Sequence, residues 1–566
     1  MRHRTVRIFN DIPRPIWLFT AIWFVMGCIQ AAMMELHPDE AYQWQVSRLL
    51  DWGYFHHPPM IALFIKVGYA LFENELGVRL TSVLASTIGI PLLFKLSETV
   101  NVRIFILVYL SFILTQAGSF FAAPDAPLIL FSLLFLVTLK HYLKNDSYLI
   151  ALVLAFIVAA LMYSKYHAIV LFGSCLVAVP RLLLRKSFWL TLVVSVMLFL
   201  PHVLWQFDHD LISYKFNWVI RDKAEWDFGL VINYLAGQLI LLGPVGILLL
   251  IAIAKLKDRV VFDRVLVSII LGFFGFFLFL SFRGRIEANW TATAFLPLII
   301  LGTRSIAHQT RLLNVFRPAA ILCAAILMIG RIYLTTPWAG VGIPTSFPLR
   351  GWNAWAQAIK EKADGKPVFF ANSYQYVSQY SFYSGEQGYH WSMLNYNGNQ
   401  FDLWNMDSVI TGGPFVTVFP FGHDSTLAVA QSEFPTFYVC PVPSYHSYRN
   451  LRFSFEQKRY VVPTDSEFVL TGVIFNGTGS AIDLDQLLTD HPVYVFYYVN
   501  SKNEFLQEAD CNGCTGILPH GESRPVSFRL RIPEGSDTCF VRFGLEFAFE
   551  IPEQNSDFVQ LKVNRD

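Results

Sequence analysis

The chain is organised around one stretch, residues 37–60, which reads HPDEAYQWQVSRLLDWGYFHHPPM. It follows the first long apolar segment and carries two adjacent carboxylates, Asp39 and Glu40. Charged groups near bilayer depth are costly, and they tend to mark ion, proton or substrate sites. Pro38 ends the preceding helix and Asp39 lies near a new N-terminus, so a helix start is predicted here. Capping needs only one carboxylate and leaves Glu40 and the histidines unexplained. The stretch therefore predicts a functional loop at the membrane surface.

Composition places the chain among integral membrane proteins. Its 566 residues are 54% hydrophobic and 16% aromatic but only 15% charged, a balance that is unusual for soluble enzymes. The formal net charge of +1 gives no reason to expect a nucleic-acid partner. Residues 1–7 are basic, but the apolar segment after Pro15 lacks a small-residue cleavage site. We expect this segment to be retained as the first span.

Apolar segments long enough to cross a bilayer recur along the first 340 residues. A span needs about 20 apolar residues. Polar breaks separate about 11 candidates of this kind, namely 17–34, 78–96, 104–122, 126–143, 148–163, 168–184, 188–206, 230–254, 261–282, 291–301 and 319–334. Segment 60–72 is shorter, so we expect it to lie in the interface, as does the helix that begins at Asp39. The predicted fold class is a polytopic α-helical membrane protein with additional interfacial helices.

Basic residues are concentrated in alternate connections between these segments, which face the cytoplasm by the positive-inside rule. They are Lys95, Arg103, Lys140, Lys144, Arg181, Arg185, Lys186, Lys255, Lys257, Arg259, Arg304 and Arg311. The N-terminus is then cytoplasmic. The opposite face receives 37–60, 124–125, 164–167, 208–227, 283–290 and everything after Thr335. Every stretch with unusual chemistry therefore falls on the extracytoplasmic face.

Beyond the spans the composition changes, and two extracytoplasmic domains are predicted after a transmembrane domain at 1–340. Residues 367–372 and 412–419 have the pattern of strands and 374–382 that of a helix, which indicates a small α/β domain at 341–436. Short alternating runs separated by Gly, Pro, Asn and Asp then indicate a β-sandwich at 437–566.

Four cysteines in this last part, Cys440, Cys511, Cys514 and Cys539, are compatible with disulfides in an exported domain. A bond between Cys511 and Cys514 is the simplest expectation. Four cysteines allow three full pairings, and sequence does not choose among them.

Acidic and basic groups share the extracytoplasmic face. Arg and Lys at membrane level suit a lipid phosphate, because Arg binds phosphate through two N–H groups and Lys supplies a point charge. A carboxylate beside them can deprotonate an acceptor hydroxyl as a general base. Snorkelling to the interface is the alternative explanation for the basic residues. The groups concerned are Asp39, Glu40, Asp125, Glu287, Lys165, Arg283 and Arg285, with His56, His57 and His167 in the same loops.

Several motifs together resemble bacterial polytopic glycosyltransferases of the GT-C superfamily, in the branch related to protein O-mannosyltransferases and to the lipid A aminoarabinose transferase. They are HPDEAYQW with WGYFHHPPM, PDAP, YSKYHA and RIEANW. The resemblance extends from Trp17 to Trp404, because ANSYQYVSQYSFY and NQFDLW also match that branch. The segment from Val439 onward does not match the family pattern.

This resemblance implies an inverting enzyme of the bacterial cytoplasmic (inner) membrane. Such an enzyme moves a sugar from a polyprenyl-phosphate donor to the hydroxyl or phosphate of a cell-envelope lipid, glycan or protein on the outer face. Its expected partners are the lipid-linked sugar, membrane lipid and the acceptor, with no nucleic acid.

The resemblance also implies roles for individual residues. Asp39 matches the catalytic acidic residue of the first loop, with Glu40 beside it, and Asp125 matches the acidic position of the second loop. Lys165 and Arg285 match positions expected near the lipid phosphate. The full substrate-binding set predicted for this chain is Tyr42, His56, His57, Lys165, Tyr166, Arg283, Arg285, Glu287 and Asn289.

Two alternatives accompany this reading. No cofactor is expected to be required, but Asp39, His56 and His57 can in principle hold a divalent metal ion; His-His-Pro-Pro equally suits a rigid turn. A transporter or flippase of lipid-linked substrates is the alternative function. Transporters place charges at mid-span and often show repeat symmetry, whereas here the charges gather at one face, which favours the enzyme. A catalytically inactive scaffold is disfavoured by the two acidic positions.

Overall fold

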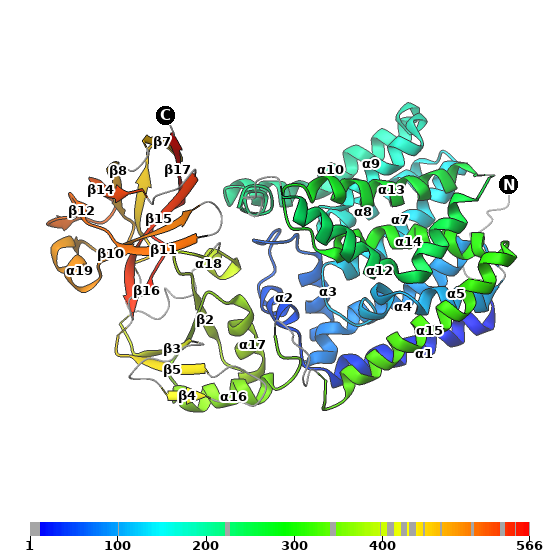
Figure 1. Ribbon diagram of the computed structural model, residues 1–566, viewed down its shortest axis with the longest axis horizontal. Helices are drawn as coiled ribbons and strands as arrows, with labels where there is room; N and C mark the ends of the chain where they lie inside the picture. The colour runs from blue at the N-terminus through cyan, green and yellow to red at the C-terminus, as the bar shows by residue number, and fades with distance from the viewer. Residues whose placement is uncertain are drawn as a thin grey trace. The chain divides into compact units, whose positions relative to one another are not determined.

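The computed structural model describes residues 12–99, 101–220, 227–257, 259–339, 347–396, 398–404, 412–419, 427–429, 437–444, 448–463, 467–499, 503–532, 538–548 and 551–564. Internal contacts divide the chain into two compact units, Met1–Gly351 and Trp352–Asp566. The first unit is helical and the second is mixed α and β (Figure 1).

Helices form the whole regular structure described in the first unit. Among the described residues, eight helices are long and apolar enough to cross a membrane, and shorter apolar helices accompany them. The chain is therefore a multi-pass membrane protein. The elements are α1 (Arg14–Met33), α2 (Pro38–Arg48), α3 (Met60–Tyr69), α4 (Glu75–Ser97), α5 (Val102–Leu110), α6 (Ile113–Ala117), α7 (Asp125–Lys144), α8 (Tyr148–Ser164), α9 (Ala168–Ala178), η1 (Pro180–Leu184), α10 (Lys186–Asp208), α11 (Ile212–Tyr214), η2 (Lys215–Ile220), α12 (Phe228–Ala254), α13 (Val261–Leu280), η3 (Ala288–Thr291), α14 (Ala292–Ala307) and α15 (Thr310–Thr335).

Each expected span corresponds to helix, but three of them are shorter or broken. The expected span 104–122 is divided into α5 and α6, because Phe112 adopts an extended backbone between them. The segment 168–184 is likewise α9 followed by a 3₁₀ turn at Pro180, and α8 has only 17 residues. The break at Ser111-Phe112 interrupts the apolar run by only one small polar residue, so hydropathy alone does not reveal it.

Local sequence explains why several helix ends carry the polar residues. Helix α2 begins with proline at its first position and with His37 as N-cap, whose ring nitrogen accepts a hydrogen bond from the Asp39 backbone N–H. Helix α7 begins at Asp125 directly after Pro124, and α8 ends immediately before Lys165. These termini meet at one end of the helical bundle, since Asp125 contacts Lys165 there.

An α/β sheet opens the second unit, in the order β2-β1-β3-β5-β4. The strand β1 pairs in parallel with β2 and β3, whereas β5 runs antiparallel to β3 and β4. Helices α16 and α17 pack beside this sheet (Figure 1). The elements are α16 (Trp352–Ala363), β1 (Val368–Ala371), α17 (Tyr374–Ser384), β2 (Gly388–Trp391), α18 (Gln400–Trp404), β3 (Phe415–Phe419), β4 (Leu427–Val429) and β5 (Phe437–Val442).

Two further sheets, in the orders β11-β10-β15-β17-β7 and β12-β14-β8-β6, share one buried core. That arrangement agrees with the sandwich expected from the alternating runs. The elements are β6 (Leu451–Phe455), β7 (Arg459–Pro463), β8 (Glu467–Asn476), β9 (Ile482–Asp483), α19 (Leu484–Asp490), β10 (Val493–Val499), β11 (Asn503–Glu508), β12 (Cys511–Asn512), β13 (Ile517–Leu518), β14 (Ser523–Arg531), β15 (Thr538–Ala548), β16 (Ile551–Pro552) and β17 (Val559–Asn564).

Strand pairing in the second unit runs past the domain boundary expected at 436. Strand β5 begins at Phe437 but pairs with β3, so the α/β sheet extends past that point. The two parts are also joined by buried hydrogen bonds, in which Arg542 donates to the carbonyls of Leu394 and Tyr396 at 3.1 and 2.7 Å. Contacts accordingly group 352–566 as one unit.

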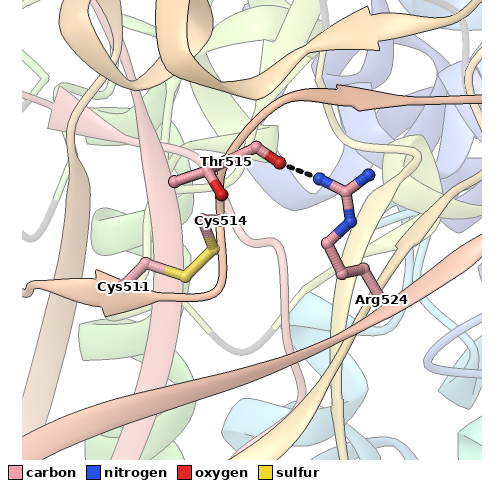
Figure 2. The surroundings of a disulfide bond; sticks show 4 residues. All are labelled: Cys511, Cys514, Thr515 and Arg524. Carbon is pink, nitrogen blue, oxygen red and sulfur yellow. Dashed lines mark hydrogen bonds between the residues drawn. A yellow bond between two sulfur atoms is a disulfide. The ribbon is translucent and has the colours of Figure 1, made fainter.

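One disulfide joins Cys511 to Cys514 across the turn that follows β12, as Figure 2 shows. Beside it, Arg524 donates a hydrogen bond to the carbonyl of Thr515, which fastens the turn to β14. Cys440 and Cys539 are free, buried thiols in separate cores. Of the pairings that the sequence left open, the structure contains the local one.

Candidate active site

The deepest charged group at this end of the bundle is Glu40, which is completely buried. Its carboxylate accepts two hydrogen bonds from Arg79, at 2.8 and 2.5 Å, and one each from the backbone N–H groups of Ala122 and His37, at 2.8 and 3.0 Å. Burial by itself would raise the pKa of Glu40, but the charge and hydrogen bonds of Arg79, with the two backbone N–H groups, outweigh it and lower that pKa.

Arg79 uses its remaining donors on the end of α1. It donates to the carbonyls of Ala31, Met34 and Glu35, at 3.0, 2.6 and 2.9 Å. Both oxygens of Glu40 are thus enclosed by donors, which hold the carboxylate in place, and its catalytic role stays a prediction. The sequence reading overlooked Arg79, although an arginine inside an apolar span was itself a signal.

Asp39, which directly precedes Glu40 in the chain, is exposed where Glu40 is buried. Its side chain is 55% exposed, and its carboxylate lies 3.7 Å from the ring Nδ1 of His37. Desolvation by the surrounding protein is the largest influence and raises the pKa of Asp39; His37 lowers it, and the negative charges of Glu40 and Glu287 raise it further. An accessible carboxylate with a raised pKa is suited to accept a proton.

The second expected acid, Asp125, is bound from two other loops. One of its oxygens accepts a hydrogen bond from the Lys165 ammonium group at 2.9 Å, and the other accepts one from the Asn289 amide at 2.9 Å. Lys165 is only 5% exposed, so it is not a residue that snorkels to the interface. The structure thus brings together three residues that the sequence placed in separate loops.

The loop between α13 and α14 carries two exposed basic residues of the expected set, Arg283 and Arg285. Arg285 is 78% exposed in its side chain and lies 3.3 Å from the carboxylate of Glu287. Arg283 is also exposed. One short segment carries Arg285, Glu287 and Asn289 at every second position. Because Asn289 donates to Asp125, this segment connects Arg285 with the Asp125–Lys165 pair.

The expected aromatic and histidine residues form two further groups. Tyr42 is buried and its hydroxyl shares a hydrogen bond with Nδ1 of His56 at 3.1 Å. His57 is partly exposed, with its ring 6.4 Å from that of His56. Tyr166 bonds to Nε2 of His202 at 3.0 Å. His202, like Arg79, lies within a long apolar helix and was not singled out from the sequence.

Two cavities adjoin these residues within the first unit. The first has about 1010 Å³ of empty space and is mostly apolar, with Asp125 and Asn289 among its polar lining residues. The second has about 730 Å³ and is lined by Tyr166, His167, Arg285 and Trp290 together with apolar side chains of α9 and α13. A mixed lining of this kind suits an amphipathic ligand.

Two of the residues considered as metal ligands have other partners in the structure. Asp39 lies beside His37, whereas His56 is held by Tyr42. Over the described part of the chain, no three His, Cys, Asp or Glu residues are grouped so that they can hold a metal ion. The alternative with Asp39, His56 and His57 as metal ligands stays a prediction.

Part of the chain resembles a known protein family in sequence, and most of it resembles solved structures in fold. Residues 56–205 match the family model described as dolichyl-phosphate-mannose-protein mannosyltransferase. Two crystal structures of ArnT from Cupriavidus metallidurans, apo and bound to undecaprenyl phosphate, are 16% identical to this chain, with TM-scores of 0.54 and 0.53. Each alignment covers 75% of this chain and 97% of ArnT. The membrane region has the GT-C fold.

The GT-C resemblance stated from the motifs is thus confirmed. The match to the family model begins at His56, and so covers Asp125 and Lys165 but not Asp39 or Arg285. No curated protein sequence matches the chain. The GT-C likeness establishes the fold, and the roles of individual residues rest on the geometry described above.

Proposed function

We propose that this protein is an inverting glycosyltransferase that moves a sugar from a polyprenyl-phosphate donor to an acceptor hydroxyl or phosphate of the cell envelope. The observation that carries the proposal is the exposed carboxylate of Asp39, whose pKa is raised partly by Glu287. Glu287 in turn lies beside Arg285, which lines the amphipathic second cavity. Glu287 therefore interacts both with the proposed base, Asp39, and with the proposed phosphate-binding cation, Arg285.

The chemistry assigned to these groups is a single displacement at the anomeric carbon. Asp39 removes the proton of the acceptor hydroxyl while the new bond from its oxygen to the sugar carbon forms. The bond between that carbon and the donor phosphate breaks, and polyprenyl phosphate leaves with the bonding electrons. Arg285 stabilises the charge that develops on the phosphate. An acceptor that is already an anionic phosphate needs no base.

Lys165 and Asp125 have a different part in this proposal from the one expected. Their ion pair is largely buried, so it neutralises two charges at the membrane surface and holds Asn289 at the first cavity. The apolar walls of the two cavities provide room for prenyl units of the donor. The relative bound to undecaprenyl phosphate supports a lipid-phosphate donor for this chain.

The reaction is assigned to the extracytoplasmic face, with the N-terminus in the cytoplasm. Support comes from the basic residues at the bundle end opposite Asp39. Reporter fusions after Lys257 and after Asp566 should report opposite compartments, and the same compartment for both would contradict this orientation.

Substitution of Asp39 tests the function. In membranes supplied with labelled polyprenyl-phosphate sugar, Asp39→Asn should lower transfer about 100- to 10,000-fold, the usual effect of losing a general base. Donor binding should change little. A matched control is Asp51→Asn in the segment that follows α2, whose carboxylate accepts hydrogen bonds from Trp205 and from the Trp52 backbone. Normal turnover by Asp39→Asn would remove this residue from the mechanism.

A further inference from the structure

A third cavity, remote from the candidate active site, lies at the opposite end of the bundle. It has about 1000 Å³ of empty space and is formed where α12 and α14 end. Its polar lining consists of two exposed lysines, one arginine, one histidine, one serine and one glutamine, namely Lys255, Lys257, Arg304, His308, Ser305 and Gln309. Among the described residues, no carboxylate belongs to this lining.

Basic residues at helix C-termini often do no more than neutralise terminal carbonyl groups. Here other side chains already occupy those carbonyls. The Gln309 amide donates to the carbonyls of Ala252 and Ser305, at 2.9 and 3.3 Å, and Arg259 donates to that of Ile253 at 3.1 Å. The two lysine ammonium groups are therefore not needed to cap α12.

Two carboxylates of the described residues near this cavity, Asp263 and Glu98, are already paired. Asp263 lies 2.5 Å from Arg304, and Glu98 lies 3.2 Å from Arg304 and 2.5 Å from Lys140. Within the described ranges, neither Lys255 nor Lys257 has a hydrogen-bond or ion-pair partner for its ammonium group. The cavity therefore carries two positive charges that are not compensated by these residues.

Ser305 provides a second and independent indication of a ligand. Its side chain is 2% exposed, and its hydroxyl has no hydrogen-bond partner among the described residues. Buried hydroxyl groups in native proteins are usually satisfied, and an orphan costs free energy until a partner is supplied. This hydroxyl belongs to the lining of the same cavity as the two lysines.

We propose that this cavity binds a phosphate group, carried by the headgroup of an anionic membrane lipid. A phosphate diester offers several acceptor oxygens, which match a lining of ammonium, guanidinium and hydroxyl donors. Basic pockets between transmembrane helices at a membrane surface are suited to such headgroups. The cavity lies at the C-terminal ends of α12 and α14, two helices long and apolar enough to span a membrane, where a lipid of the adjoining leaflet can enter it. The lipid acts there as a structural ligand, separate from the transferase substrates.

The test is a lipid titration of the purified full-length protein in a neutral detergent. Phosphatidylglycerol, phosphatidylcholine and inorganic phosphate are added separately, and the unfolding temperature is followed. The cavity variant is Lys255→Gln/Lys257→Gln. The matched control is Lys144→Gln/Lys186→Gln, which removes two exposed lysines at the same end of the bundle but outside the cavity.

Phosphatidylglycerol should raise the unfolding temperature of the wild type and of the control, with little effect of phosphatidylcholine. The cavity variant should need about 25-fold more phosphatidylglycerol, because each lysine near an anionic lipid contributes about a factor of five. Equal protection by inorganic phosphate would identify a soluble phosphate as the ligand of the same site. If the cavity variant and the wild type respond alike to phosphatidylglycerol, or the control pair responds like the cavity pair, the proposal is overturned.

Discussion

Arg79 and Glu40 form a bidentate ion pair in which both side chains are at most 1% exposed. The pair joins α4 to the start of α2, and the additional bonds of Arg79 and Glu40 reach the end of α1 and the backbone at Ala122. Four segments around Glu40 are thus fixed through two side chains. Since Asp39 precedes Glu40 in the chain, the buried pair determines where the exposed carboxylate lies.

Breaking this pair should destabilise the protein strongly. Glu40→Gln leaves the Arg79 charge buried without its counter-charge, a change that typically costs about 3–5 kcal/mol. Thermal unfolding of the purified protein measures the loss. The matched control is Glu98→Gln, because Glu98 is 49% exposed and its ion pairs with Lys140 and Arg304 should contribute about 1 kcal/mol or less. Equal losses in the two variants would show that the buried pair has no special role.

The dependence of activity on pH should report the surroundings of Asp39. A general base works when deprotonated, so activity falls as pH decreases through its pKa, and a raised pKa moves that fall to higher pH. Glu287→Gln removes a charge that raises the pKa of Asp39 and should shift the fall to lower pH. His37→Asn removes a group that lowers this pKa and should shift the fall to higher pH, while Asn keeps the helix cap.

Profiles of kcat/KM for the wild type and the two variants supply the measurement. Shifts in opposite directions are expected. Two shifts of the same sign, or none, would mean that the acid side of the profile belongs to another group.

The Lys165–Asp125 pair should behave as a unit. Lys165→Met alone leaves Asp125 without its cation and should cost about 2 kcal/mol of stability, as should Asp125→Asn alone. The double variant should lose less than the sum of the single losses, because it leaves neither charge unpaired. Unfolding temperatures of the four proteins test this, and additive losses would count against a coupled pair.

Substitution of Arg285 should weaken the apparent affinity for the donor and have little effect on the stability of the protein. Its guanidinium is exposed at the second cavity, so Arg285→Ala should raise the apparent KM for the polyprenyl-phosphate sugar about 10-fold or more. The unfolding temperature should stay near the wild-type value. Arg283→Ala is the comparison, since Arg283 is exposed in the same loop but lines neither cavity. A wild-type KM for Arg285→Ala would leave the donor phosphate without its proposed partner.

The second unit should fold stably as an isolated fragment only if the fragment contains the whole α/β sheet. A fragment of 352–566 contains the whole α/β sheet and the sandwich, whereas a fragment that begins at Val439 removes the first residues of β5 and all its partners. We expect the longer fragment to unfold cooperatively on heating and the shorter fragment to have a lower unfolding temperature. Circular dichroism measures the unfolding of both fragments. Equal stability of the two fragments would show that the sandwich does not need the α/β sheet.

Much of this protein was predictable from sequence because the membrane imposes simple rules. Apolar length located the helices, and alternating basic loops placed Asp39, Asp125, Lys165 and Arg285 at one end of them. Alternation of apolar and polar residues predicted strands such as β8 and β14, since a sheet with one buried face repeats every two residues.

The roles of neighbouring residues were decided only by the tertiary structure. Asp39 and Glu40 are adjacent carboxylates, and sequence gives no reason to separate them. In the fold, Glu40 faces Arg79, which is 39 residues distant, and becomes fully buried, while Asp39 stays accessible. Lys165 likewise gained a partner 40 residues distant in Asp125. The physical reason is that burial and charge pairing depend on which helix ends meet in space, whereas periodicity and composition record only which residues prefer to be buried.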